Sequence, residues 1–342
     1  MTAAIVVVAV SWCLFRASAD ELPAVEPSKV VDIESAGVAE RHPVITAVAI
    51  APGGSFLATA GDDHVVRIWN RASGRVVHSL KGHADWVRTL AFSPDGNTLA
   101  SAGDDRQIIL WKVSTGKSAS RIARHPHAIY AIAYNLEGTL LAAVGFGNKV
   151  HLYDPRSARL VRQLDGPGID LRSVVFSPDG RQLATAGRDS QIRAWAMPQG
   201  TIDFEVSAGS GRIRTLGYLP DGDKLVSAGE GRTISIWNTR DGGEHHRFTC
   251  PAGKVLSMAV CGESLIATGG SDNLVRVWNW QTKTEVDRLS GHTGSVATLA
   301  YDPVSTVIIS GSFDTTVRVW KLNSAGRDPA DPGAARPGPP VR

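Results

Sequence analysis

Short stretches in which apolar and polar residues alternate recur along most of the chain. One example is Val87–Phe92 (VRTLAF), which a Ser-Pro-Asp-Gly turn connects to Thr98–Gly103 (TLASAG). A period of two predicts β-strands with one buried face, and the 3.6-residue period of an amphipathic helix is not seen in these stretches. The pattern therefore predicts an all-β protein built of short strands and tight turns.

The alternation is itself periodic, because each group of strands ends in a similar motif with a terminal aromatic residue. Gly61–Trp69 reads GDDHVVRIW, and Gly270–Trp278 reads GSDNLVRVW. The seven terminal residues, 42 or 41 positions apart, are Trp69, Trp111, Tyr153, Trp195, Trp237, Trp278 and Trp320. Four predicted strands in each repeat indicate a four-stranded antiparallel blade that occurs seven times.

These repeats resemble those of the WD40 family. The elements that carry the resemblance are Gly-His pairs at 82–83 and 291–292 and Trp-Asn pairs at 69–70, 237–238 and 278–279. The resemblance covers residues 28–322 and implies a seven-bladed β-propeller with four antiparallel strands per blade. Family members close the last blade with an N-terminal strand, which we expect from residues 28–40.

Family members also hold a blade together with a buried network of His, Ser or Thr, Asp and Trp. Such polar groups are costly when buried alone and stabilising when they satisfy one another. The resemblance implies structural networks of His42, Thr59, Asp63 and Trp69 in the first blade, His83, Ser101, Asp105 and Trp111 in the second, and His292, Ser310, Asp314 and Trp320 in the seventh. Blades three to five depart from this pattern, either by drift or because their loops serve binding.

A hydroxyl, an imidazole and a carboxylate are also the groups of a hydrolytic triad, as at Ser101, His83 and Asp105. In a blade of this kind the hydroxyl is engaged by tryptophan, and a substrate has no room to reach it. We therefore expect no catalytic residues, no cofactor and no metal. The predicted function is a non-enzymatic scaffold for protein–protein interaction; the alternatives are a propeller enzyme or a binder of small anions or sugars in the central channel.

Partners of such propellers often dock where the innermost strand of each blade begins, around the channel. The side chains expected to line the channel are Thr46, Arg88, Tyr130, Arg172, Arg214, Leu256 and Ala297. The predicted partner-binding set is Trp86, Arg88, Tyr130, Phe146, Arg172, Arg188 and Arg214.

Arginines beside exposed aromatic rings are enriched at interface hot spots. We therefore expect a protein or an acidic peptide segment to dock on this set, with Arg172, Arg188 and Arg214 as its charge partners. The alternative is that these arginines are ordinary rim charges that pair with Glu230 or Asp170.

The formal net charge is +3 and Lys and Arg form no run, so nucleic-acid binding is not predicted. The apolar run Ala3–Phe15 and the following Ala17-Ser18-Ala19 predict a signal peptide over residues 1–19, too short to span a bilayer. A linker over residues 20–27 is expected to follow. We expect an exported protein, periplasmic or extracellular, that is monomeric by itself and has no transmembrane segment in the mature chain. Without a signal peptide the protein would be cytoplasmic.

Two further features concern the end of the chain and the cysteines. Residues 323–342 are rich in Pro and Gly and are expected to form a disordered tail. Cys250 and Cys261 flank a predicted strand over Lys254–Val260, which places them about 20 Å apart. A disulfide requires Cα atoms within about 7 Å, so two thiols are expected.

Overall fold

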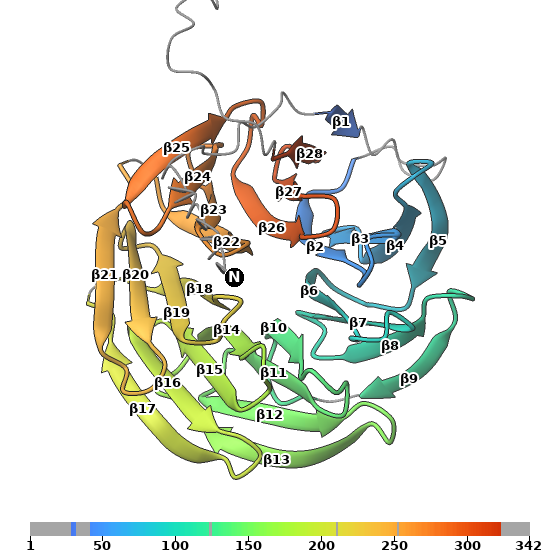
Figure 1. Cartoon of the computed structure of the whole chain (residues 1–342). Coiled ribbons are helices and arrows are strands. Elements are labelled where there is room, and N and C mark those ends of the chain that lie inside the picture. Colours follow the sequence, from blue (N-terminus) through green and yellow to red (C-terminus); the bar gives the residue numbers. More distant parts are fainter. Residues whose placement is uncertain (1–28, 32–41, 123–124, 210, 252, 323–342) are drawn as a thin grey trace, which may run out of the picture.

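The computed structural model describes residues 29–31, 42–122, 125–209, 211–251 and 253–322. The predicted signal peptide, the linker and the C-terminal tail lie outside these ranges. The described residues form seven four-stranded antiparallel sheets in a ring around a central channel (Figure 1). This confirms the predicted seven-bladed propeller. Nowhere in the described ranges is there a helix with the length and hydropathy needed to cross a membrane.

The strands of each blade are given from the channel outward. Blade 1 consists of β2 (Ile45–Ile50), β3 (Phe56–Gly61), β4 (Val65–Asn70) and β5 (Arg75–Lys81), and blade 2 of β6 (Val87–Phe92), β7 (Thr98–Gly103), β8 (Ile108–Lys112) and β9 (Ser118–Ile122). Blade 3 consists of β10 (Ile129–Tyr134), β11 (Leu141–Gly145), β12 (Lys149–Asp154) and β13 (Arg159–Asp165), and blade 4 of β14 (Leu171–Phe176), β15 (Gln182–Gly187), β16 (Gln191–Ala196) and β17 (Thr201–Ser207). Blade 5 consists of β18 (Ile213–Tyr218), β19 (Lys224–Gly229), β20 (Thr233–Asn238) and β21 (Glu244–Thr249), and blade 6 of β22 (Val255–Cys261), β23 (Leu265–Gly270), β24 (Val275–Asn279) and β25 (Thr284–Leu289). Blade 7 consists of β26 (Val296–Asp302), β27 (Val307–Ser312), β28 (Val317–Lys321) and β1 (Lys29–Val31).

The turns form where the sequence pattern places them. In blade 2, Gly96 adopts φ 70° and its N–H donates to Ser93 O at 2.8 Å. The left-handed conformation costs glycine little because it has no Cβ atom. The hydroxyl of Ser93 donates to the Asp95 carboxylate in the same turn. The turn thus reverses the chain between β6 and β7 at the end of the blade away from the start of β6.

The hydrophobic core lies between neighbouring blades. One cluster joins Ala58 and Ile68 of blade 1 to Leu99 and Trp111 of blade 2, all of them buried. Burying a side chain as large as leucine stabilises the fold by about 1.5–3 kcal/mol. Because each blade is covered by the next, the propeller depends on closing the ring.

The N-terminal strand closes it as predicted. Lys29 of β1 lies opposite Val319 of β28, and Val31 lies opposite Val317, in antiparallel pairing. The outer edge of blade 7 is therefore covered by a strand from the other end of the chain. Cys250, directly after β21 of blade 5, and Cys261, at the end of β22 of blade 6, are buried thiols, as expected.

Blade 2 contains the network that the resemblance implied. His83 Nδ1 lies 2.8 Å from Asp105 Oδ2, and His83 Nε2 lies 2.7 Å from Ser101 Oγ. Trp111 Nε1 donates to the same hydroxyl at 2.8 Å. Blade 7 has the same three contacts, at 2.8, 2.7 and 2.9 Å, among His292, Asp314, Ser310 and Trp320.

Blade 1 contains only part of this network. Trp69 Nε1 donates to Thr59 Oγ1 at 2.9 Å, as the tryptophans of blades 2 and 7 do to their serines. His42, however, is exposed, and Asp63 forms a salt bridge with Arg67 at 2.7 Å. His42 therefore lies outside the network in which the resemblance placed it.

The position of the histidine relative to the strand accounts for this difference. His42 comes three positions before Ile45, the first residue of β2, whereas His83 comes four positions before Val87, the first residue of β6. The segment between His42 and β2 is one residue shorter than its counterpart in blade 2, so the imidazole is not carried into the blade. His42 matches the family pattern in residue type, but it does not match it in position relative to the strand.

Candidate functional site

The seven innermost strands share a β-bulge directly after their first residue. In β6, for example, the pairing with β7 shifts between Val87 and Thr89, so that Arg88 has no place in the regular ladder. A bulge redirects a side chain, here toward the channel. The seven bulged residues, all of which line one opening, are Thr46, Arg88, Tyr130, Arg172, Arg214, Leu256 and Ala297. We call this opening the channel mouth; its seven residues are those expected from the sequence.

Aromatic rings and arginines stack on the blade 2 to 4 side of the channel mouth. The guanidinium carbon of Arg172 lies 3.5 Å from the ring centroid of Tyr130 and 5.5 Å from that of Phe146. The Tyr130 and Phe146 rings are 5.1 Å apart, and 52% of Phe146 is exposed. Arg88 lies 4.5 Å from the half-buried ring of Trp86. Five members of the predicted binding set are thus in one continuous stack of cations and rings.

Both arginines of this stack, Arg88 and Arg172, are also paired with carboxylates. Arg88 donates from Nε and Nη2 to Asp104, with its shortest contact at 2.6 Å. Arg172 Nη2 lies 2.7 Å from Asp170 Oδ1. Both ion pairs hold the guanidinium groups in fixed positions against the rings.

A second group of charges continues around the channel mouth into blades 5 and 6. Arg212 bridges Asp170 and Glu230, with contacts of 3.3 and 3.2 Å. Arg214 and Lys254 also bind Glu230, at 2.5 and 3.2 Å. Burial acts to raise the pKa of Glu230, but hydrogen bonds from Arg214 and Lys254 outweigh it and lower the pKa. Glu230 is therefore held as a carboxylate.

Cations exceed carboxylates in this region. The group that we call the cationic cluster, Arg172, Arg212, Arg214 and Lys254, shares only two carboxylates. Among the described residues, the buried Nε atoms of Arg172 and Arg212 and the Oδ1 atom of Asp170 have no hydrogen-bond partner. The ion pairs of this cluster therefore leave a net positive charge, with four cations to two carboxylates.

Arg188 adds a further positive charge in blade 4. Its side chain is exposed, and no ion pair to it is found in the described part of the chain. The next residue, Asp189, accepts a hydrogen bond from the main-chain N–H of Ile169. Of the three arginines predicted as charge partners, Arg172 and Arg214 thus bind Asp170 and Glu230, as the alternative interpretation predicted, while Arg188 faces solvent.

The chemistry available at the channel mouth is that of binding. Guanidinium groups remain charged at any physiological pH and present donors to carboxylates, and the rings offer apolar contact. In the part of the chain that the structure describes, no group of three or more His, Cys, Asp or Glu side chains is arranged to hold a metal ion.

Sequence reasoning missed a histidine pair inside blade 3. His125 Nε2 lies 3.1 Å from His151 Nδ1, His125 Nδ1 lies 2.7 Å from His127 O, and both rings are 3% exposed. Burial lowers the pKa of His125 to about 4. The only sequence signal was three histidines in the repeat that lacks the usual Ser, Asp and Trp.

The family model "WD domain, G-beta repeat" matches six stretches, at residues 36–70, 74–112, 158–196, 202–238, 243–279 and 283–321. Together they cover more than half of the chain. The chain belongs to the WD40 repeat family. The stretch between the second and third matches contains β10, β11 and β12 of blade 3, the blade in which the histidine pair replaces the usual network.

Similarity to curated proteins is confined to short stretches. The chain is 41% identical over 59 residues to the periodic tryptophan protein 2 homolog of Neurospora crassa, covering 17% of this chain and 7% of that protein. It is 46% identical over 55 residues to the probable coatomer subunit beta' of Schizosaccharomyces pombe, covering 16% and 7%. It is 52% identical over 42 residues to the probable serine/threonine-protein kinase PkwA of Thermomonospora curvata, covering 12% and 6%. These likenesses concern the repeat and a small share of each relative.

Proposed function

We propose that this WD40 protein is a non-enzymatic scaffold whose channel mouth binds an acidic, partly apolar segment of a partner protein. The observation that carries the proposal is the cationic cluster, in which four cations share two carboxylates beside the exposed ring of Phe146. Arg188 extends the positive charge toward solvent. Acidic side chains would balance the excess positive charge of the cationic cluster.

The stacked rings suit the apolar part of such a segment. Arg172 is already held against Tyr130 and bound to Asp170, so its position does not have to be fixed when a partner binds. Preorganised anchors lose less entropy on association than mobile ones. Phe146 offers apolar area next to these charges, which is the composition found at interface hot spots.

The fold and the relatives fit a protein-interaction scaffold. One relative is named as a coatomer subunit, that is, as part of a larger assembly. A rigid ring with variable loops is suited to this role, because the scaffold positions loop residues without taking part in chemistry.

Binding of a designed acidic peptide would test the proposal. The probe is a ten-residue peptide of glutamate with two phenylalanines, titrated calorimetrically and compared with the same peptide carrying glutamine for glutamate. We expect the glutamate peptide to bind at least tenfold more tightly, and its affinity to fall as salt is raised. Inorganic sulfate serves as the small-anion control.

Two charge reversals locate the site. Arg188→Glu and Lys254→Glu change exposed side chains, so the melting temperature should stay constant while affinity falls at least tenfold, or about 1.4 kcal/mol. Arg181→Glu is the matched control, because its side chain is 85% exposed in the turn between β14 and β15, at the opposite end of the blade. Equal loss in the control, or no loss in the double variant, would refute the site. Tight binding of sulfate alone would favour a small-anion binder.

A further inference from the structure

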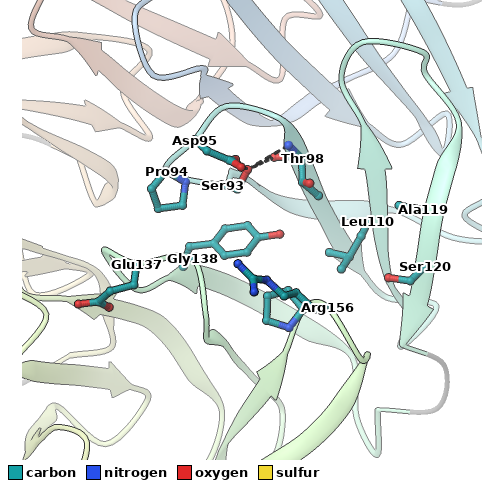
Figure 2. Close-up of a pocket in the computed structure, with 12 residues that line it drawn as sticks. Ser93, Pro94, Asp95, Thr98, Leu110, Ala119, Ser120, Glu137, Gly138 and Arg156 are labelled. Atoms are coloured by element: carbon teal, nitrogen blue, oxygen red, sulfur yellow. Dashed lines mark hydrogen bonds between the residues drawn. The ribbon is translucent and has the colours of Figure 1, made fainter.

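A second cavity lies between blades 2 and 3, on the face opposite the channel mouth. Its volume is about 290 Å³. Figure 2 shows Thr98, Asp95 and Ala119 of blade 2 around this space, with Arg156 pointing toward it from blade 3. The sequence patterns drew no attention to this cavity, and it is independent of the proposed function.

Tyr134 lines the cavity and carries a polar atom that the protein does not satisfy. Its hydroxyl oxygen is buried, and no hydrogen-bond partner for it exists among the described residues. Burial, and then the nearby charge of Asp95, raise the pKa of Tyr134, so the phenol keeps its proton and remains a donor. Buried polar groups without partners are rare in folded proteins and point to a missing acceptor.

The same molecule shows what such an acceptor looks like. Two repeats further along, Tyr218 stands 84 positions after Tyr134, and its hydroxyl lies 3.4 Å from Gln182 Oε1. Gln182 Nε2 in turn donates to Thr239 O at 2.9 Å and to the carboxylate of Asp203. Between blades 4 and 5, a glutamine carboxamide therefore connects the tyrosine to the neighbouring loop.

Between blades 2 and 3 that glutamine is replaced by a shorter residue. Thr98 occupies the position of Gln182, and Ala119 occupies that of Asp203. Pro155 stands at the position of Thr239 and lines the cavity. The tyrosine and the loop are retained, but no side chain of the described chain joins them.

The charges around the cavity favour a neutral ligand group. Asp95 already accepts hydrogen bonds from Ser93 and from Asn97, and Glu137 accepts one from Asn135 at 2.7 Å. Their two negative charges outnumber the single positive charge of Arg156, so a carboxylate is disfavoured. A group that both accepts and donates without carrying charge matches these surroundings.

We propose that this cavity binds a primary carboxamide, in the form of a glutamine side chain from a partner segment. The carboxamide oxygen accepts from the Tyr134 hydroxyl, and the amide N–H group donates to the main-chain carbonyl of Pro155. Gln182 is the internal template for both contacts. Arg156 is exposed beside the cavity, where the main chain of the segment would pass.

Blocked single amino acids serve as probes in ligand-observed NMR titrations of the full chain. The probes are N-acetyl-glutamine methylamide and its glutamate, methionine and lysine counterparts. For a ligand of this size we expect a dissociation constant on the order of 1 mM for glutamine and at least tenfold weaker binding of the other three. The proposal would be overturned if the glutamate, methionine or lysine probe bound as tightly as the glutamine probe or more tightly. It would also be overturned if the glutamine probe did not bind detectably.

Three variants test the mechanism. Thr98→Gln should fill the cavity from within, abolish binding of the glutamine probe and raise the melting temperature by satisfying Tyr134. Thr115→Gln, at an exposed threonine of the same blade, is the matched control and should bind like the wild type. Tyr134→Phe should weaken binding about tenfold without filling the space. Unchanged affinity in both Thr98→Gln and Tyr134→Phe would contradict the assignment.

Discussion

Blades 2 and 3 are neighbours that carry a buried histidine at the same position of the repeat, yet they satisfy it differently. In blade 2, His83 lies between the carboxylate of Asp105 and a serine hydroxyl. In blade 3, His125 lies against His151 and a main-chain carbonyl, and Gly147 stands where blade 2 has Asp105. In blade 2 a carboxylate is the partner of the imidazole, whereas in blade 3 two imidazoles share one hydrogen bond.

The difference extends to the surface. Blades 2 and 7 use their network residues internally, which fixes the loops above them. Blades 4 and 5 have Pro167 and Gly209 at the histidine position. Their inner strands supply Arg172 and Arg214 to the channel mouth, and the loop before β18 supplies Arg212. Blade 2 keeps its network and supplies Arg88 from the same bulge, so the bulge presents a side chain to the channel with or without the network.

The largest effect is expected from breaking a complete network. Burial acts to raise the pKa of Asp314, but hydrogen bonds from Thr316 and from the main chain outweigh it and lower the pKa to about 2. Asp314→Ala removes the acceptor shared by His292, Thr293 and Thr316 and should cost about 3–5 kcal/mol in urea unfolding, because hydrogen bonds to a charged group contribute about 1.5–3 kcal/mol each. Asp63→Ala in blade 1, whose partly buried carboxylate pairs with Arg67 and with no histidine, should cost less, about 1 kcal/mol. Similar losses in the two variants would remove the distinction between these blades.

Acid should act on the histidine pair. The pKa of His125 is about 4 in the folded state and ordinarily 6.5, so the unfolded state takes up the proton first. The contribution of His125 to the free energy of unfolding is therefore fully present above pH 6.5. It decreases by about 3 kcal/mol as the pH falls toward 4. The charged or titratable groups that act on the pair are His127 and Lys149.

The variant His125→Gln isolates this contribution. Urea unfolding of the wild type and the variant at pH 7.5 and pH 4.5 should give curves that converge at the lower pH. Parallel pH dependence in both proteins would show that acid acts elsewhere.

Removing the closing strand should have a smaller effect. A chain that lacks residues 29–31 loses the hydrogen bonds between β1 and β28, at about 1 kcal/mol each, and should be destabilised by about 1–3 kcal/mol. Urea unfolding of the truncated and full chains gives the difference. Full stability after truncation would mean that blade 7 does not need its fourth strand.

The smallest effect is expected at His42. Because this side chain is exposed, His42→Ala should change stability by less than about 0.5 kcal/mol, whereas His83→Ala should be clearly destabilising. Thermal unfolding of both variants makes the comparison. A large loss at His42 would place it in the blade 1 network after all.

The fold could be predicted because its signals are local and repeated. The alternation of apolar residues and the terminal aromatic residues recur every 42 or 41 residues in all seven repeats, with Ser-Pro-Asp-Gly turns at 93–96 and 177–180, and seven copies indicate a ring. The residues of the channel mouth followed from the same register, since one position after the first residue of each inner strand is bulged in all seven blades. The closing strand was predicted because the Pro- and Gly-rich composition of residues 323–342 does not favour a strand.

What the sequence did not reveal depends on contacts between residues far apart in the chain. His42 is exposed because it lies one residue closer to its strand than His83 does. This difference can be recognised only when the first residues of β2 and β6 are known. The 3.1 Å contact between His125 and His151, and the open space beside Tyr134, arise from packing across strands and blades. Residue types alone do not determine such distances.

The central claim is that a partner docks at the channel mouth through the cationic cluster and Arg188. The most direct test is cross-linked capture from the native organism with three tagged full-length proteins: the wild type, Arg188→Glu/Lys254→Glu and Arg181→Glu. We predict that a partner carrying an acidic segment is captured by the wild type and by Arg181→Glu and is lost from the double variant, with melting temperatures unchanged. Capture of the same partner by all three proteins would contradict the account and move the binding site away from the channel mouth.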